Sequence, residues 1–414
     1  MTAPAASNSV ATRELHSELW KDNLRDYGLL LSLLLIVAFF YFLTGDPSSG
    51  AHASVEPVNI TNIIMQNSYV IIMALGMLLV IVAGHIDLSI GSVVGFVGAV
   101  AGSMIVYWKV PFPIVIVVGL VIGAAIGAAQ GVLIAYAKIP SFIVTLGGML
   151  IFRGLTGNML LGQFVGPFPR GFQDIASGFI PDLTEFHGLE NTLPAWLHVK
   201  LLSLLIGVLG AVVMFAMSLR SWRRARAENM DAQPLPLLLI KNIIFAALII
   251  AIAYNLALWK GLPVILVIMA ALTLFYGFVT TRTTMGRRIY ALGGNLLAAK
   301  LSGVKTERLV FLTFANMGLL AGLAGLVVAA RLNSSTPSAG NSFELDVIAA
   351  CFIGGVSASG GVGKVMNVVI GALFMGVMNN GMSLIGLGIF WQQVVKGLVL
   401  LAAVGIDVYQ KRKG

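Results

Sequence analysis

Long apolar stretches that carry almost no acidic or basic side chains dominate this sequence and limit what it can fold into. Most of them reach the roughly 20 residues with which a helix crosses about 30 Å of hydrocarbon. Only 10% of the 414 residues are charged, whereas soluble domains carry about 25%. A soluble globular enzyme, a disordered chain and a collagen-like chain are therefore excluded. The sequence predicts an all-α polytopic membrane protein with about 10–12 transmembrane helices or half-helices.

Twelve stretches of this kind occur, and two of them are irregular. The stretch at 141–161 contains Arg153, and the stretch at 345–358 is too short for a full straight span. The second is expected to be a half-helix or a re-entrant piece. The twelve stretches cover approximately 27–44, 62–83, 88–107, 113–136, 141–161, 201–219, 237–258, 262–281, 309–330, 345–358, 365–384 and 388–406.

The distribution of Lys and Arg over the connecting segments predicts the orientation of the chain. With the N-terminus inside, the inner segments hold 18 basic residues and the outer segments hold 5. Because cytoplasmic loops collect Lys and Arg, both termini are expected in the cytoplasm. The same bias accounts for the net charge of +9, so we expect no nucleic-acid partner. The inner segments are the N-terminus, 84–87, 137–140, 220–236, 282–308, 359–364 and the C-terminal tail.

The chain is expected to form one transmembrane domain between short cytoplasmic ends. The N-terminal segment mixes acids and bases, which is not the layout of a cleavable signal. The long outer loop is rich in proline and aromatic residues, so ordered turns are expected in it. The boundaries are 1–26 for the N-terminal segment, 27–408 for the transmembrane domain, 162–199 for the outer loop, 220–236 and 282–308 for the long inner loops, and 409–414 for the tail.

Four glycines recur at every fourth position in the stretch 113–136 and form one ridge. They are Gly119, Gly123, Gly127 and Gly131. A ridge of this kind lets two membrane helices approach closely. The sequence favours tight packing within the chain, and a subunit interface is the alternative.

The inner loop 282–308 contains a short helix with both ends marked. Asn295 is a good N-cap, and Gly303 stands where a helix of about two turns ends. Ala298 and Ser302 form a small-residue face that suits docking into a groove of another protein. An amphipathic helix on the membrane surface is the alternative. The candidate docking residues are Gly293, Gly294, Asn295, Ala298, Ala299, Lys300, Ser302 and Gly303.

Ionisable groups near the apolar stretches are expected to have structural roles. Asp87 lies between two stretches and is predicted to cap the helix that starts near Leu88 or to anchor the loop. Glu344 and Asp346 open the short stretch and are expected to do the same on the outer side, with Arg331 as a possible partner. Lys396 is expected to pair with a carboxylate or a carbonyl group.

Neutral polar side chains inside the apolar stretches are the candidates for contacting a solute. Amides left without partners in hydrocarbon are costly, so each one needs a partner, a cavity or a solute. Hydrogen bonding between helices is the commoner use. The candidates are Gln66, Asn67, Asn316, Asn379, Asn380, Gln392 and Gln393.

Catalysis and nucleotide binding find little support in the sequence. The glycine-rich stretch 357–365 lacks the hydroxyl residue after Lys364 and the leading glycine of a phosphate-binding loop. The five histidines are scattered, and we expect no catalytic residue and no metal site. The single cysteine, Cys351, lies in an apolar run and is expected to pack there.

The inner loop resembles the coupling-helix loop of permease subunits in bacterial ATP-binding-cassette sugar importers of the ribose and xylose type. GRRIYALGGNLLAAKLSGV carries this resemblance, and it extends over most of the chain from about residue 60. The basic middle section makes the xylose-type permeases the most similar. Further matching motifs are VAGHIDLSIGSVVG at 82–95, KIPSFIVTLGGMLIFRG at 138–154, TPSAGNSFELDVIAACFIGGVSASGGVG at 336–363 and FWQQVVKG at 390–397.

The resemblance implies a transport subunit in the bacterial inner membrane that is not itself an enzyme. A separate cytoplasmic ATP-binding subunit would hold ATP and Mg, and a periplasmic sugar-binding protein would deliver a monosaccharide such as D-xylose. A permease homodimer is expected, with no cofactor in this chain. A transporter driven by an ion gradient is one alternative, since that class carries carboxylates at the membrane midplane. A membrane scaffold without transport activity is the other.

Overall fold

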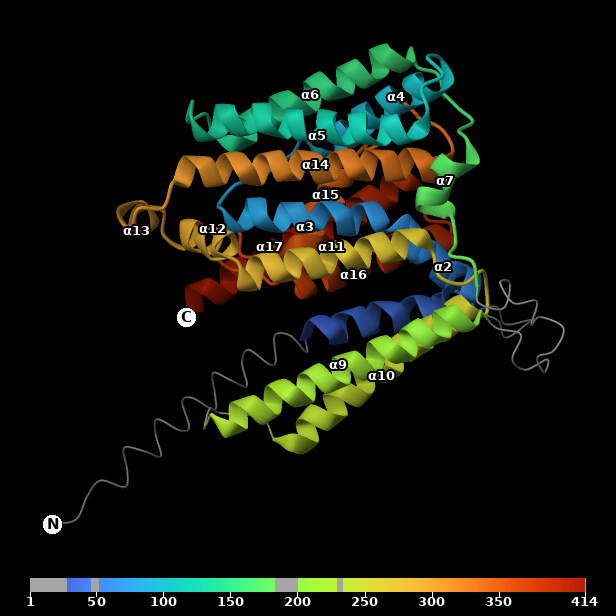
Figure 1. Ribbon diagram of the computed structural model, residues 1–414, viewed down its shortest axis with the longest axis vertical. Helices are drawn as coiled ribbons and strands as arrows, with labels where there is room; N and C mark the ends of the chain where they lie inside the picture. Colours follow the sequence, from blue (N-terminus) through green and yellow to red (C-terminus); the bar gives the residue numbers. More distant parts are fainter. Residues whose placement is uncertain (1–27, 46–51, 183–199, 229–233, 414) are drawn as a thin grey trace.

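The structure is a computed structural model that describes residues 28–45, 52–182, 200–228 and 234–413, and in these ranges it is a helical bundle (Figure 1). The predicted N-terminal segment 1–26 lies outside the described residues. The first described helix is Gly28–Leu43. The elements that follow are η1 (Ala53–Val55), α2 (Pro57–Gln66), α3 (Ser68–Val82), α4 (Ile90–Val106), α5 (Phe112–Ala135), α6 (Ser141–Leu160), α7 (Arg170–Ser177), α9 (Leu201–Ala227), α10 (Leu235–Ala257), α11 (Val264–Arg282), α12 (Thr284–Gly294), α13 (Leu296–Leu301), α14 (Thr306–Leu332), α15 (Phe343–Ile353), α16 (Val365–Leu384) and α17 (Ile389–Lys413).

Each of the twelve apolar stretches forms a helix, which confirms the all-α polytopic membrane fold. Eight helical segments among the described residues are long and apolar enough to cross a membrane, and three more are shorter apolar helices. The one remaining stretch, 345–358, forms the 11-residue helix α15, so it is a half-helix as the length of the stretch indicates. The stretch at 62–83 begins earlier than expected, because Pro57 starts α2 and only a short break at Asn67 separates α2 from α3.

The core lies around α3 and α14, which run side by side through the middle of the bundle (Figure 1). Helix α14 also packs against α5 and α4, and α6 lies on the outside of α4. Nearly every residue of α3 is buried, which fits a helix that is apolar on all sides.

The glycine ridge of α5 packs inside the chain, against α14. A Cβ atom at Gly123 would collide with the backbone of Gly318 and Gly322, and a Cβ at Gly127 would collide with Phe314 and Gly318. Glycines therefore face glycines across this contact, and the backbones of the two helices touch. The glycine ridge therefore serves tight packing within the chain, as the sequence favours.

A non-helical segment, 333–342, turns back into the bundle after α14 and leads into α15. Its Ser335 donates a hydrogen bond to the carbonyl oxygen of Gly98 on α4. Further along, Ala339 and Gly340 lie against Gly95 and Gly91, close to the start of α4. Because this segment descends along α4 before α15 begins, α15 has room for only half a span. Irregular backbone at this depth is tolerated since protein surrounds it.

Helices α9 and α10 form a hairpin that stands apart from the main bundle (Figure 1). The hairpin meets α2 through the end of α10, where Leu256 and Ala257 are buried. The basic inner loop lies at its far tip, where α9 ends in Arg224 and Arg226, and residues 229–233 lie outside the described residues. The outer loop contains the ordered helix α7, which buries Phe172 and Ala176, while 183–199 are outside the described residues.

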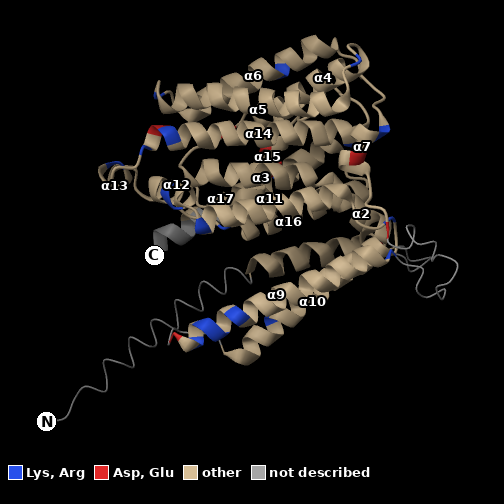
Figure 2. Cartoon of the chain, viewed as in Figure 1, with Lys and Arg blue, Asp and Glu red and all other residues tan. Residues whose placement is uncertain are grey.

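Several segments that the charge distribution assigns to one side of the membrane do lie at one end of the bundle. Figure 2 shows Lys and Arg gathered at the end that carries α12 and α13 and at the corresponding end of α9. Here the backbone N–H of Gly361 donates to the carbonyl oxygen of Val82, at 2.9 Å. Helix α17 reaches Lys413, so the tail expected at 409–414 continues that helix.

Candidate functional site

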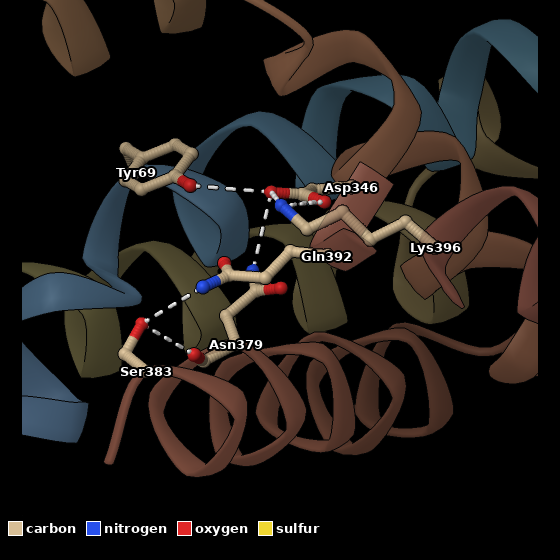
Figure 3. A network of polar contacts seen from close by, with 6 residues as sticks. All are labelled: Tyr69, Asp346, Asn379, Ser383, Gln392 and Lys396. Atoms are coloured by element: carbon tan, nitrogen blue, oxygen red, sulfur yellow. Dashed lines mark hydrogen bonds and ion pairs between the residues drawn. The ribbon is translucent and has the colours of Figure 1, made fainter. Parts of the chain in front are cut away.

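A buried ion pair joins α15 to α17 inside the bundle. Figure 3 shows Asp346 and Lys396 with the side chains around them, and the Lys396 Nζ lies 2.9 Å from each carboxylate oxygen. The Asp346 side chain is only 2% exposed. Tyr69 of α3 donates from its hydroxyl group to the same carboxylate at 3.4 Å, and its ring stacks on Phe343 with centroids 3.9 Å apart. Three helices therefore meet at one charged centre.

Two of the candidate solute-contacting amides belong to this cluster. The Asn379 Nδ2 donates to Asp346 at 3.2 Å. Its backbone carbonyl oxygen accepts from the Ser383 hydroxyl group, and Gln392 reaches the same hydroxyl at 3.5 Å and the carbonyl oxygen of Leu387 at 2.8 Å (Figure 3). Gln392 and Asn379 are only partly buried, so the cluster extends from Asp346 toward the surface.

The acidic residues of α15 are placed differently from the prediction. Glu344 and Asp346 do stand in the first turn, where a carboxylate stabilises a helix N-terminus. Both are buried within the bundle. Asp346 pairs with Lys396 and not with Arg331, so the expectation for Lys396 is confirmed and the one for Arg331 is wrong. Packing of α17 against α15 brings the lysine to the carboxylate.

Three other candidate amides hold helices together. The side chains of Asn380 and Asn59 exchange two hydrogen bonds of 2.9 Å between α16 and α2. Asn67 donates to the carbonyl oxygen of Ala372 at 2.6 Å. Asn316 accepts from the Tyr276 hydroxyl group at 2.5 Å. These three amides form hydrogen bonds between helices, which is the commoner role of such residues. Of the remaining candidates, Gln66 and Gln393 are exposed.

Asp87 anchors a loop and is not the N-cap of α4. Helix α4 begins at Ile90, two residues later than the sequence suggests, and Ser89 occupies the N-cap position. One oxygen of Asp87 accepts from the backbone N–H and the hydroxyl group of Ser89, at 2.8 and 2.7 Å. Gln130 of α5 donates to the Ser89 hydroxyl group at 2.9 Å. Burial raises the pKa of Asp87 to about 6, and the hydrogen bonds from Ser89 oppose that rise.

The short helix of the inner loop forms as predicted. The Asn295 side chain accepts from the backbone N–H of Ala298 at 2.9 Å, and Gly303 adopts a φ of 81°, in the left-handed region. Helix α13 projects from the end of the bundle (Figure 1), with Leu297 and Leu301 68% and 81% exposed. Of the small residues, Ala298 and Ser302 are also exposed, whereas Ala299 is buried at the base. Lys300 reaches toward Glu307, with Nζ and Oε1 4.0 Å apart.

A close backbone junction ties the inner loop to the rest of the bundle. A Cβ atom at Gly293, near the end of α12, would collide with the carbonyl oxygen of Val82 and with the backbone N of Gly361. The Tyr290 hydroxyl group donates to the carbonyl oxygen of Gly363 at 2.7 Å. The loop that carries α13 is thus fixed to the end of α3 and to the segment between α15 and α16.

Sequence reasoning missed several members of these networks. Tyr69, Asn59, Tyr276 and Gln130 each supply one half of a polar contact between helices. Each of them is a polar residue in or next to an apolar stretch, and that is the signal by which the sequence could have indicated it.

The sequence of this chain matches known permeases over most of its length. A family model described as the permease component of the branched-chain amino acid transport system matches residues 59–404. The chain belongs to this permease family. The match covers the permease from α2 to α17 and includes α13, the junction at Gly293 and the Asp346 cluster.

The relatives of this permease include proteins named for two pentoses. Xylose transport system permease proteins of Haemophilus influenzae and of Escherichia coli are each 38% identical to it over 94% of its length, and the alignments cover 98% and 93% of those proteins. A ribose import permease protein of Escherichia coli is 32% identical over 97% of this chain and 98% of its own length. This order confirms the stronger resemblance to the xylose-type permeases. No solved structure matches the permease.

Proposed function

We propose that this permease is the transmembrane subunit of an ATP-driven importer that carries D-xylose, or a closely similar monosaccharide, across the bacterial inner membrane. The observation that supports this most is its 38% identity to xylose transport system permease proteins over nearly the full length of both. A separate cytoplasmic subunit hydrolyses ATP with Mg, a periplasmic sugar-binding protein delivers the sugar, and two copies of the permease form the path. Both termini face the cytoplasm.

The coupling element in this proposal is α13. Its exposed small residues, Ala298 and Ser302, face away from the bundle, and its base is fixed at Ala299. The ATP-binding subunit docks on this helix. The junction at Gly293 carries the motion of α13 to α3 and to the segment that follows α15.

The sugar path in this proposal runs beside α15, along neutral polar groups. Asn379 and Gln392 border it at the Asp346 cluster, where their amides are only partly buried. The Asp346–Lys396 pair holds the wall of the path, because each charge already has its partner.

Transport driven by an ion gradient is a second candidate function, and one observation favours it. Asp346 and Glu344 are carboxylates at the start of a half-helix inside the membrane domain, an arrangement found in ion-coupled transporters. The observed pairing of Asp346 with Lys396 argues against it, because that carboxylate is already neutralised.

One reconstitution separates the two functions. Proteoliposomes that hold the permease, the ATP-binding subunit and the sugar-binding protein are given a panel of labelled pentoses and hexoses. We expect xylose uptake that needs internal ATP and persists when an ionophore collapses proton and sodium gradients. ATPase activity should rise when sugar-loaded binding protein is added. Sugar uptake that requires the ion gradient and does not depend on ATP would establish the second function instead.

A further inference from the structure

An arginine sits on the exposed face of a helix that crosses the membrane. Arg153 lies past the middle of α6 and is exposed, with Leu150 and Leu155 beside it on the surface. A charged side chain in hydrocarbon is costly, so such residues almost always face a partner or a water-filled path. The face of α6 that carries Arg153 is therefore not a simple lipid-facing surface.

Arg153 opens onto a polar cavity of about 90 Å³ between α4, α6 and the segment 333–342. The cavity is lined by Ser92 of α4, Arg153 and Thr156 of α6, and Ser338 and Asn341 of the descending segment. All five of these side chains can donate a hydrogen bond, and four of them can also accept one. Hydroxyl, amide and guanidinium groups therefore make up most of the lining of this cavity.

The backbone around the cavity is held rigidly. Gly340 adopts a φ of 77°, and a Cβ atom there would collide with the carbonyl oxygen of Gly91. Gly95 is in the same kind of contact with the carbonyl oxygen of Ala339. The segment 333–342 is thus in close backbone contact with α4 just before Asn341, which lines the cavity together with Arg153.

Two buried polar atoms at this place have no hydrogen-bond partner among the described residues. They are Ser92 Oγ and Glu344 Oε2. Ser92 lines the cavity and is 3% exposed, and Glu344 lies against Gly91, the residue next to it. Buried polar groups in native proteins are nearly always paired, so the unpaired Ser92 Oγ in the lining of this polar cavity indicates that a hydrogen-bonding ligand binds there.

We propose that this cavity is a contact point for the hydroxyl groups of the transported sugar, with Ser92, Arg153 and Asn341 as its binding residues. This inference rests on the proposed function and names further residues that contact the transported sugar. A monosaccharide offers several adjacent hydroxyl groups, each able to donate and to accept. The Arg153 guanidinium donates, the Asn341 amide does both, and the Ser92 hydroxyl group does both.

The Ser92→Ala variant distinguishes solute contact from a structural role. Because Ser92 Oγ has no hydrogen-bond partner among the described residues, its removal should leave the abundance and the melting temperature of the permease unchanged. Maximal xylose uptake should fall about 3- to 10-fold, as expected for the loss of one hydrogen bond. ATPase stimulation by loaded binding protein should persist, so fewer sugar molecules move per ATP. The half-saturating sugar concentration should stay the same, since the binding protein captures the sugar.

Matched controls come from the same chain. Ser203 of α9 is also buried with an unpartnered hydroxyl group, and it lies in the α9–α10 hairpin, so Ser203→Ala should leave uptake at the wild-type rate. Arg153→Gln should reduce uptake at least as much as Ser92→Ala, whereas Asn158→Ala, on an exposed position of α6 outside the cavity, should not.

Cysteine labelling tests the cavity without measuring transport. The sequence holds one cysteine, Cys351, which is fully buried, so a second cysteine can be labelled selectively. Asn341→Cys in the assembled importer should react with a charged, membrane-impermeant thiol reagent during ATP turnover, because such reagents need a thiolate in contact with water. Xylose with its binding protein should slow the reaction several-fold, and a sugar that is not imported should not.

The outcomes are separable from those of the proposed function. If the wild-type importer takes up none of the sugars, the proposed function fails and this inference fails with it. If the wild type imports xylose while Ser92→Ala and Arg153→Gln match their controls, only the inference is overturned. An Asn341→Cys protein that stays unlabelled during turnover overturns it as well.

Discussion

Lys396 and Asp346 lie 50 residues apart in the chain and form a bidentate ion pair, with Nζ 2.9 Å from both carboxylate oxygens. The carboxylate is almost fully buried, and the lysine side chain is 17% exposed. A charge in this setting is tolerated because its partner is present. The pair thereby fixes α17 against the half-helix α15.

Removing one charge of this pair should destabilise the permease more than removing both. Asp346→Asn leaves Lys396 buried without its counter-charge, and breaking a buried pair in this way costs about 3–5 kcal/mol. The double variant Asp346→Asn with Lys396→Met removes both charges and should recover most of the loss. The measurement is the melting temperature in detergent together with membrane abundance. Equal losses in the single and double variants would show that the pair is not the source of stability.

Asp87 should be replaceable by Asn and not by Leu. An asparagine Oδ1 can accept from the Ser89 backbone N–H and hydroxyl group as the carboxylate does, so transport and abundance should be largely kept. Leucine leaves the buried backbone N–H of Ser89 without its acceptor, at about 1–3 kcal/mol, and should lower the abundance of the permease, while the Ser89 hydroxyl group still has Gln130 as a partner. Quantitative membrane blots with an uptake assay measure both. Normal abundance with abolished transport in Asp87→Asn would mean that the carboxylate acts on the solute.

The stability of the permease should depend on pH through Asp87. Burial raises the pKa of Asp87 from 3.8 to about 6, so between these values the folded state binds more protons than the unfolded state. Stability should therefore fall as the pH rises from about 4 to about 6 and stay level above that range. Melting temperatures in detergent across this range measure the effect. The Asp87→Asn variant should show a flatter profile, and an unchanged slope in that variant would assign the effect to another group.

The two adjacent glycines at the end of α12 offer a matched pair. A Cβ atom at Gly293 would meet backbone atoms of Val82 and Gly361 that cannot move aside, whereas a Cβ at Gly294 meets nothing within 4 Å. Gly293→Ala should therefore cost about 1–3 kcal/mol or more through overpacking, and Gly294→Ala should be neutral. Melting temperature and coupling of ATP hydrolysis to uptake are the measurements. Equal behaviour of the two variants would refute the role of this junction.

Local patterns predicted the elements of this fold better than they predicted its pairs. Apolar length gave the spans and the half-length of α15, and Asn295 with Gly303 gave both ends of α13, because these features depend only on neighbouring residues. The partner of Asp346 depends on how α15 and α17 are rotated against each other, and no local pattern contains that information. Of the two roles expected for Asp87, the loop anchor is the one observed and the N-cap is not, because α4 starts two residues later, and helix ends are commonly uncertain by that much.

The last prediction concerns the docking of the ATP-binding subunit on α13. Ala298 is exposed and carries only a methyl group, so Ala298→Trp cannot enter a groove that fits the small face, and overpacking costs about 1–3 kcal/mol. Gly303 has a φ of 81°, so Gly303→Val strains the backbone by about 1–2 kcal/mol and shifts the end of the helix. Both variants should reach the membrane at normal levels and lose co-purification of the ATP-binding subunit, sugar uptake, or both. Leu297→Met keeps the size and apolar character of an exposed side chain and should behave as the wild type. If Ala298→Trp and Gly303→Val retain both the partner subunit and uptake, α13 is only a membrane-surface helix.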